Sequence, residues 1–297
     1  ILTIETHYER LLEKGPKRLS PFVVPKLMVN ATAGQISIRL NLRGCNTSMA
    51  TACATGGHAI ADAYMMIQRG MADVMFAGGT EAAVSRLCIA AFSAMKALST
   101  RNDNPEQASR PFDKDRDGFV LAEGSAIVVL EDYEHAKSRG ARIYAELVGF
   151  GITGDAHHIA APDPEGTGAG KAMEIAMTSG AVNPTDVGYI NAHGTSTPLG
   201  DAAEVAAVKR VFGDHSRDLA MSSTKSMLQP KPKPPAEVWV SAVCASSAVS
   251  DPVHGHSKVI TPSSFTPSMK LAFGALAVRQ RSLCNLSDNN GLADGRP

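Results

Sequence analysis

The chain has 297 residues, of which 44% are hydrophobic, so it is long enough to bury one large core or two. Lysine plus arginine and aspartate plus glutamate both number 29, and this balance implies no charge-driven partner. Only 5% of the residues are aromatic and no basic run interleaves with them, so the sequence does not support nucleic-acid binding. No apolar run approaches the length of a membrane span.

The five cysteines stand at positions 45, 53, 88, 244 and 284, with no C-x-x-C pairing and no zinc-ligand spacing. This pattern predicts no metal site and fits a reducing compartment. The chain opens on Ile1 rather than a methionine and shows no targeting peptide. We expect it to be the inside of a longer chain.

The first predicted functional element is a turn at Cys53 that leads into a helix over residues 59–67. Its run is MATACATGGH, in which small residues present a thiol near the start of the helix. Free N–H groups and the positive end of the helix dipole favour a thiolate there. Cys53 is therefore either a nucleophile or a structural cysteine, because free cysteines often behave as small buried hydrophobes. His58 falls in the helix interior and is predicted to be structural.

Strands and helices then alternate along the chain. A strand is predicted over 72–77 and a helix over 84–97, followed by the β-branched run 126–130, typical of a strand buried on both faces. Next come a helix over 133–139, a strand over 142–151, and a helix over 171–179 that ends at Gly180. Asp155, His157 and His158 lie in the polar stretch between the last two; they suggest a metal, but a connecting loop is the preferred interpretation.

A polar loop follows the next predicted strand, residues 187–190. It reads NAHGTSTPLGD and places His193 among hydroxyls before Asp201 starts a helix over 202–212, which ends at Gly213. In α/β folds, chemistry is found where strands end. A third run, MSSTKS, again puts hydroxyls and a cation after an apolar segment. Helices between strands predict a layered α/β fold.

These motifs resemble those of the β-ketoacyl-[acyl-carrier-protein] synthases, the condensing enzymes of type II fatty-acid synthesis in the thiolase superfamily. The resemblance runs from about residue 20 to residue 227 and includes TACATG, AGGTEA, RPFDKDRDGFVLAEGSA, GDAHHIAAPDPEG, NAHGTSTPLGDAAE and SSTKSM. Polyketide-type ketosynthases usually carry DTACSS and EAHGTGT, so the chain is more similar to the fatty-acid branch. The stretch SPFVVPKLMVNATAGQISIR is especially similar to organellar and bacterial elongation synthases.

The resemblance implies a thiolase-like layered αβαβα core of two related halves, incomplete at both ends. Residues 1–141 would be the first half without its N-terminal strands, residues 142–227 the start of the second half, and residues 228–297 an atypical and poorly ordered tail. It also implies an acyltransferase of fatty-acid biosynthesis that takes an acyl group onto Cys53 and condenses it with malonyl-acyl carrier protein to give 3-oxoacyl-acyl carrier protein.

The resemblance further assigns roles to single residues. His193 matches the first of two histidines that donate hydrogen bonds to the developing enolate, and Lys225 matches a lysine that supports the site electrostatically. Thr195 and Thr197 match hydroxyls that contact the pantetheine arm. Each has a simpler alternative: His193 as an ordinary loop histidine, the threonines as helix caps, and Lys225 as a surface lysine. For Asp201 and Glu204 we expect structural support of the helix N-terminus.

The resemblance breaks after Met227. The family carries its second catalytic histidine five residues beyond the lysine, where this chain has Pro230, and four prolines stand within residues 230–235. They cannot form the helix that the family has there. We expect a frame-shifted or mis-spliced end, the alternative being a divergent C-terminal half in which His254 or His256 replaces the missing histidine.

The expected partners are acyl carrier protein, which brings its own phosphopantetheine, and a second copy of the chain, since the family is usually homodimeric. No other cofactor and no metal are expected. The resemblance favours a mitochondrial location, with the bacterial cytoplasm and the plastid as alternatives. The alternative function is an inactive or acylation-only fragment that binds acyl carrier protein or a partner subunit without condensation.

Overall fold

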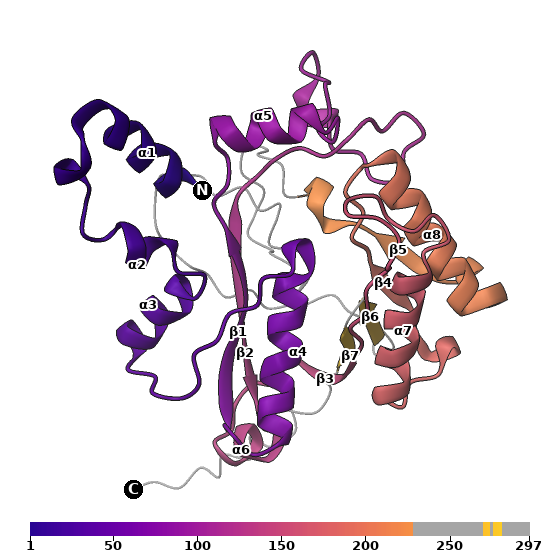
Figure 1. Ribbon diagram of the computed structural model, residues 1–297. Helices are drawn as coiled ribbons and strands as arrows, with labels where there is room; N and C mark the ends of the chain where they lie inside the picture. Colours follow the sequence, from indigo (N-terminus) through magenta and orange to yellow (C-terminus); the bar gives the residue numbers. More distant parts are fainter. Residues whose placement is uncertain (228–269, 274–275, 281–297) are drawn as a thin grey trace, which may run out of the picture.

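The computed structural model describes residues 1–227, 270–273 and 276–280 (Figure 1). Its strands form two sheets. The first is antiparallel and pairs β1 (Val74–Glu81) with β2 (Gly124–Glu131). The second has the order β3-β7-β6-β4-β5, with the bounds β3 Ala145–Phe150, β4 Tyr189–Asn191, β5 Ala220–Ser222, β6 Lys270–Phe273 and β7 Leu276–Gln280.

The helices lie around and between these sheets (Figure 1). The α-helices are α1 Leu2–Lys14, α2 Val23–Leu27, α3 Ala31–Leu40, α4 Thr55–Gln68, α5 Arg86–Ala94, α6 Tyr133–Ser138, α7 Thr167–Ser179 and α8 Pro198–Phe212. The 3-10 turns that matter for the site are η2 (Ala52–Ala54) and η6 (Thr224–Met227).

Helix α4 is sandwiched between the two sheets. Its small and apolar residues Ile60 and Ala63 pack against Ala77 of β1 and against Leu147 and Phe150 of β3. This gives the order sheet, helix, sheet, and α7 and α8 add a further helical layer on the far side of the second sheet (Figure 1). The predicted layered α/β fold is confirmed in the described part of the chain.

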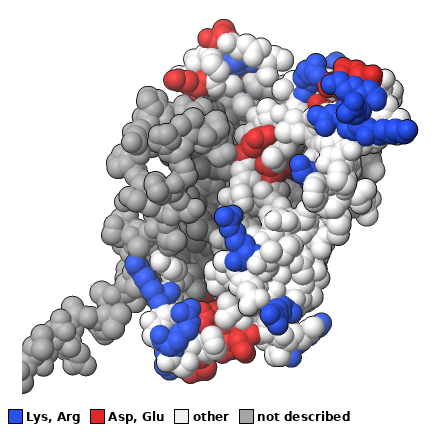
Figure 2. Space-filling model, turned by 90° about the vertical axis from the view of Figure 1, so that its left-hand side faces the viewer, with Lys and Arg blue, Asp and Glu red and all other residues white. Residues whose placement is uncertain are grey.

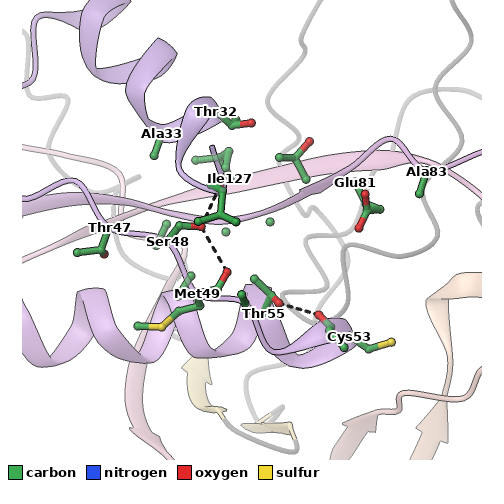
Figure 3. A pocket seen from close by; sticks show the side chains of 18 of the residues that line it. Thr32, Ala33, Thr47, Ser48, Met49, Cys53, Thr55, Glu81, Ala83 and Ile127 are labelled. Carbon is green, nitrogen blue, oxygen red and sulfur yellow. Dashed lines mark hydrogen bonds between the residues drawn. The ribbon is translucent and has the colours of Figure 1, made fainter. Parts of the chain in front are cut away.

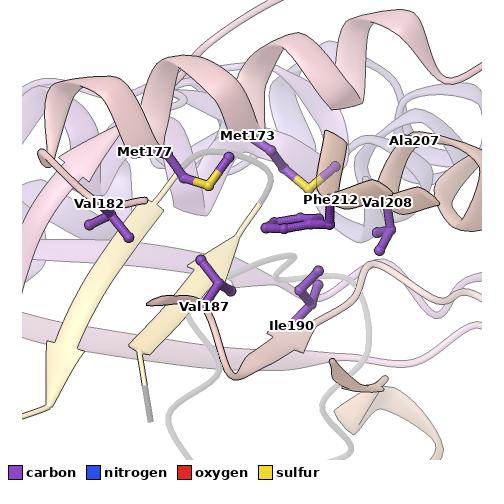
Figure 4. Packing of buried hydrophobic residues seen from close by; sticks show 8 residues of the cluster. All are labelled: Met173, Met177, Val182, Val187, Ile190, Ala207, Val208 and Phe212. Carbon is purple, nitrogen blue, oxygen red and sulfur yellow. The ribbon is translucent and has the colours of Figure 1, made fainter. Parts of the chain in front are cut away.

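The larger hydrophobic core lies under α7 and α8 (Figure 4). Their apolar faces meet the strand β4 and the segment before it, so that a stripe from each helix covers the sheet. Burying each of the Val, Ile, Met and Phe side chains in this core contributes roughly 1.5–3 kcal/mol relative to exposure. The cluster consists of Met173, Met177, Val182, Val187, Ile190, Ala207, Val208 and Phe212.

One face of the β1–β2 sheet is open, which corrects the prediction that residues 126–130 are buried on both faces. Val128 and Leu130 pack toward α4, but Ile127 and Val129 on the other face are 40% and 54% exposed. Successive side chains of a strand point to opposite faces of the sheet, and an antiparallel sheet such as β1–β2 commonly has only one face covered. A continuous apolar run does not distinguish these two situations.

The other predicted elements have counterparts of the expected type, with shifted ends. The predicted helix 202–212 begins earlier, at Pro198, with Thr197 at its N-cap position, and it ends before Gly213 as expected. The predicted helix 84–97 is confined to Arg86–Ala94. Of the tail predicted to be poorly ordered, β6 and β7 are strands of the second sheet, inserted between β3 and β4; the rest lies outside the described residues.

Helices α1, α2 and α3 form a lobe beside the open face of the β1–β2 sheet (Figure 1). None of their residues is fully buried, and several large apolar side chains are exposed, among them Tyr8, Leu12, Val24 and Ile38. In the view of Figure 2, basic and acidic side chains lie together at the upper right corner and again along the lower edge, with mostly uncharged residues between them. Large apolar side chains exposed together on one lobe are typical of a surface that contacts another protein.

Candidate active site

Cys53 lies in the 3-10 turn η2, immediately before α4, as the sequence predicts. The hydroxyl of Thr55 donates to the carbonyl of Ala52 at 2.7 Å and accepts from the N–H of Thr51 at 2.9 Å, which fastens the turn to the first residue of the helix. Ala52 has a φ of 49°, a strained conformation for a residue with a Cβ. The side chain of Cys53 is exposed and stands beyond the end of α4 (Figure 3).

His193 follows β4, in a loop held from behind by Glu204 of α8. The Glu204 carboxylate accepts from the N–H of His193 at 2.7 Å and from that of Gly194 at 2.9 Å. Burial raises the pKa of Glu204, although the two N–H donors favour its charged form. The prediction that Glu204 supports structure is right, but it supports the histidine loop directly and not only the helix end.

Lys225 lies in η6 and reaches back to the same loop. Its Nζ donates to the carbonyl oxygen of His193 at 2.5 Å. Burial and, to a smaller extent, the positive charge of Lys225 together lower the pKa of His193 to about 3. The imidazole is therefore neutral near pH 7 and retains one N–H donor and one acceptor.

Thr195 and Thr197 are on the same loop, and their hydroxyl oxygens are 3.0 Å apart. Thr197 occupies the N-cap position of α8, but its side chain makes no capping hydrogen bond to the helix. The capping alternative therefore does not explain these hydroxyls. Ser196, between them, is fully buried with a φ of 69°.

All five predicted site residues line one cavity of about 1690 Å³. Cys53 comes from the first half of the chain, whereas His193, Thr195, Thr197 and Lys225 come from the second. The cavity continues along the open face of the β1–β2 sheet toward α3, where Ser48, Met49 and Ile127 form part of its wall (Figure 3). The arrangement places a thiol, a neutral imidazole, a cation and two hydroxyls around a largely apolar space.

Asp201 is a residue whose contacts the sequence did not predict. It is buried, and its carboxylate accepts from the N–H of Phe112 at 2.8 Å and of Ser196 at 3.2 Å. The guanidinium of Arg116 lies 3.4 Å from it. The sequence motif around residues 110–118 carries a family resemblance but does not predict this contact; in the structure it lies against the histidine loop.

Within the described residues, no group of three or more His, Cys, Asp or Glu side chains is arranged to hold a metal ion. The stretch from Asp155 to His158 is a loop, as preferred: the Asp155 carboxylate accepts from the N–H of Asp163, and His158 Nδ1 accepts from the N–H groups of Ala160 and Ala161. Also within the described residues, no helix combines the length and apolar character needed to cross a membrane.

Two family models match the chain. The model described as "Beta-ketoacyl synthase, N-terminal domain" matches residues 2–136, and that described as "Beta-ketoacyl synthase, C-terminal domain" matches residues 144–229. Among curated relatives, 3-oxoacyl-[acyl-carrier-protein] synthase 2 of Vibrio cholerae is 56% identical over 225 residues, covering 75% of this chain and 54% of the relative. The protein of the same name from Staphylococcus aureus is 53% identical over 225 residues, covering 76% of this chain and 56% of that relative. The chain thus spans about half the length of the curated relatives it matches.

Solved structures give the same family likeness. A ketosynthase bound to a hexaketide, in complex with its type II PKS acyl-carrier protein, has a TM-score of 0.72 and 35% identity, covering 76% of this chain and 57% of that chain. A β-ketoacyl synthase from Burkholderia phymatum has a TM-score of 0.67 and 40% identity, covering 72% and 52%.

Proposed function

The chain belongs to the β-ketoacyl synthase family, of the type II fatty-acid branch in the thiolase superfamily, and from that premise we propose that Cys53 accepts an acyl group from a carrier thioester. The second step is a decarboxylative Claisen condensation with malonyl-acyl carrier protein. The observation that carries the proposal is the single cavity that Cys53, His193 and Lys225 line together.

Acyl transfer needs a thiolate that can reach the carbonyl carbon of a thioester. The exposed thiol of Cys53, beside the N-terminus of α4, suits this attack, since the helix end favours negative charge. The sulfur forms a new thioester bond, and the pantetheine thiol leaves. The hydroxyls of Thr195 and Thr197 would bind the polar pantetheine arm while the apolar cavity takes the acyl chain.

Condensation needs hydrogen-bond donors for the negative charge that builds on the malonyl thioester oxygen as carbon dioxide leaves. A neutral imidazole suits this role, and the low pKa of His193 keeps it neutral at physiological pH. Lys225 acts through its contact with the His193 carbonyl and through its charge. Cys53 and His193 are therefore the proposed catalytic residues, and Lys225 is the proposed supporting residue.

Condensation also depends on what replaces the family's second histidine. Pro230 stands at the matching position of the sequence and lies outside the described residues. Because of this proline, the acylation-only fragment remains the second candidate function. It keeps the Cys53 chemistry and loses chain extension.

We propose acyl carrier protein and a second copy of the chain as partners. A neighbouring solved ketosynthase is in complex with its acyl-carrier protein, which supports the first. The exposed apolar residues of α1, α2 and α3 support the second. The relatives from Vibrio and Staphylococcus support a bacterial cytoplasmic enzyme, while the mitochondrial location first expected finds no support in them.

The test measures two reactions on the purified protein, with Cys53→Ala as the blank. Transfer of a radiolabelled acyl group from acyl-acyl carrier protein reports acylation, and addition of malonyl-acyl carrier protein reports condensation. Labelling of the unchanged chain but not of Cys53→Ala supports the proposed function. Equal labelling of both would refute it.

A further inference from the structure

We propose that Ser196 is a positioning residue that holds the Thr195 and Thr197 hydroxyls at the cavity wall, where they receive the pantetheine arm of the acyl donor. The inference rests on the proposed function and extends it to a residue that does not itself border the cavity. Thr195 and Thr197 line the cavity, and Ser196 between them faces the protein interior with 0% exposure.

The first argument is the backbone of Ser196. Its φ of 69° lies in the left-handed region, which is unfavourable for a residue with a Cβ. Such a conformation persists only where the surroundings impose it. It turns the chain so that the side chains on either side of Ser196 face the same cavity while its own points away.

The second argument is the set of hydrogen bonds that imposes this turn. The Ser196 hydroxyl accepts from the N–H of Arg110 at 3.0 Å, and its carbonyl accepts from the N–H of Gly118 at 3.0 Å. Its own N–H donates to the buried Asp201 carboxylate at 3.2 Å. Every polar group of Ser196 is therefore bonded, and two of the three bonds come from the segment 110–118 of the other half.

The third argument is how closely the hydroxyl pair is fitted. The two oxygens are 3.0 Å apart, and a Cβ added at Gly200 would come within 2.5 Å of the Thr197 oxygen. The two hydroxyls are within hydrogen-bond distance on either side of Ser196, so a shift of the Ser196 backbone would move both together. Loss of the Ser196 hydroxyl leaves the Arg110 N–H without this acceptor and frees the turn.

The experiment compares two acyl donors, one that carries the pantetheine arm and one that lacks it. The donors are decanoyl-pantetheine and S-phenyl decanethioate, and mass spectrometry follows acylation of Cys53. For Ser196→Ala we expect kcat/KM with decanoyl-pantetheine to fall about fivefold, mainly because KM rises. A fivefold loss is the usual effect of about one lost hydrogen bond. The rate with S-phenyl decanethioate should stay within about twofold, because that donor has no arm to position.

Three further variants sharpen the test. Ser196→Gly accepts the positive φ without strain, so it gives the same measurement if Ser196→Ala does not fold. In a Thr195→Ala/Thr197→Ala background, Ser196→Ala should add no further loss, since it acts through the pair. Ser216→Ala removes a hydroxyl of η5 (Gly213–Arg217) that donates to the Gly213 carbonyl, and it should leave the acylation rate with either donor unchanged.

An equal loss with both donors would show a merely structural role, and no loss with either would show no role; both overturn the proposal. If neither donor acylates Cys53 of the unchanged chain, the proposed function fails. The positioning role is then tested separately by measuring the binding of free pantetheine with saturation-transfer NMR. Weaker binding to Ser196→Ala then supports the proposal, and equal binding overturns it.

Discussion

Cys45 and Cys53 are both exposed, but only Cys53 lies beside the N-terminus of a helix. Cys53 directly precedes α4, whereas Cys45 lies in the irregular segment before it. We expect iodoacetamide to modify Cys53 several-fold faster than Cys45, because the helix N-terminus favours its thiolate. Peptide mapping by mass spectrometry at low reagent concentration measures both rates in one sample, with half-buried Cys88 as a slower reference. Equal rates at Cys45 and Cys53 would argue against an activated nucleophile.

His193 makes the stability of the fold depend on pH. Its pKa falls from 6.5 to about 3 on folding, so below pH 6.5 the unfolded chain binds a proton that the folded chain does not. The stabilisation is complete above pH 6.5 and is lost as the pH falls toward about 3. The slope is at most about 1.4 kcal/mol per pH unit, and we expect roughly 1 kcal/mol between pH 7 and 5 because the ring is only half-buried.

Denaturant unfolding of the unchanged chain and of His193→Gln at pH 7 and 5 checks this expectation. The glutamine side chain does not titrate, so the stability of the variant should change less with pH. The difference between the two proteins separates the contribution of the histidine from that of the carboxylates. Glu204 has the opposite sign, since its raised pKa stabilises the fold at low pH and costs stability as the pH rises. The same pH dependence in both proteins would refute the lowered pKa of His193 in the folded chain.

At the scale of elements, the contact between β3 and α7 depends on glycine. A Cβ at Gly151 would overlap the carbonyl oxygen of Ala172 and lie 3.0 Å from the N atom of Ala176. We expect Gly151→Ala to lower the free energy of unfolding by roughly 1–3 kcal/mol, the usual cost of overpacking. Gly154→Ala is the control, because nothing lies within 4 Å of a Cβ there. The urea midpoints of both variants, at an unchanged m-value, measure the two effects. A midpoint of Gly151→Ala equal to that of Gly154→Ala would mean that α7 does not approach β3 so closely.

At the scale of the whole molecule, the segment after Met227 separates the motif-bearing part from the rest. Its proline cluster offers little apolar surface to offset chain entropy, which is the basis for expecting disorder over 228–235 and 282–297. Both ranges lie outside the described residues, so this stays a prediction. Limited proteolysis should cut within 228–235 before it cuts the motif-bearing residues 20–227. Resistance through residue 297 would show a folded end.

The same segment decides how well the chain condenses. The motif spacing predicts Pro230 in the place of the family's second imidazole. On that prediction we expect condensation to be roughly 100- to 1,000-fold slower than in a full-length synthase, the usual effect of one lost donor. Acylation of Cys53 should be less affected, because the attack depends on the thiolate. The two assays are run side by side with a full-length relative as the reference. Condensation at the rate of that relative would contradict the prediction.

Much of the fold and the site was predictable because the relevant patterns are local. Apolar periodicity predicted α4, α7 and α8, and Gly213 predicted the end of α8, since side-chain spacing and backbone freedom are properties of neighbouring residues. The motifs around Cys53 and His193 predicted which chemical groups the site contains. All five predicted site residues line the same cavity.

Only the tertiary structure decided which groups meet across the chain. Nothing in the period of residues 126–130 distinguishes a covered from an open sheet face; that depends on where α4 lies. Likewise, Glu204 reads as an ordinary helix residue until its carboxylate is seen on the His193 and Gly194 amides. The turn at Ser196 exists because Arg110 and Gly118 approach it from the other half. The sequence determines the groups and their local backbone, whereas burial and hydrogen bonds between distant segments depend on how the layers pack.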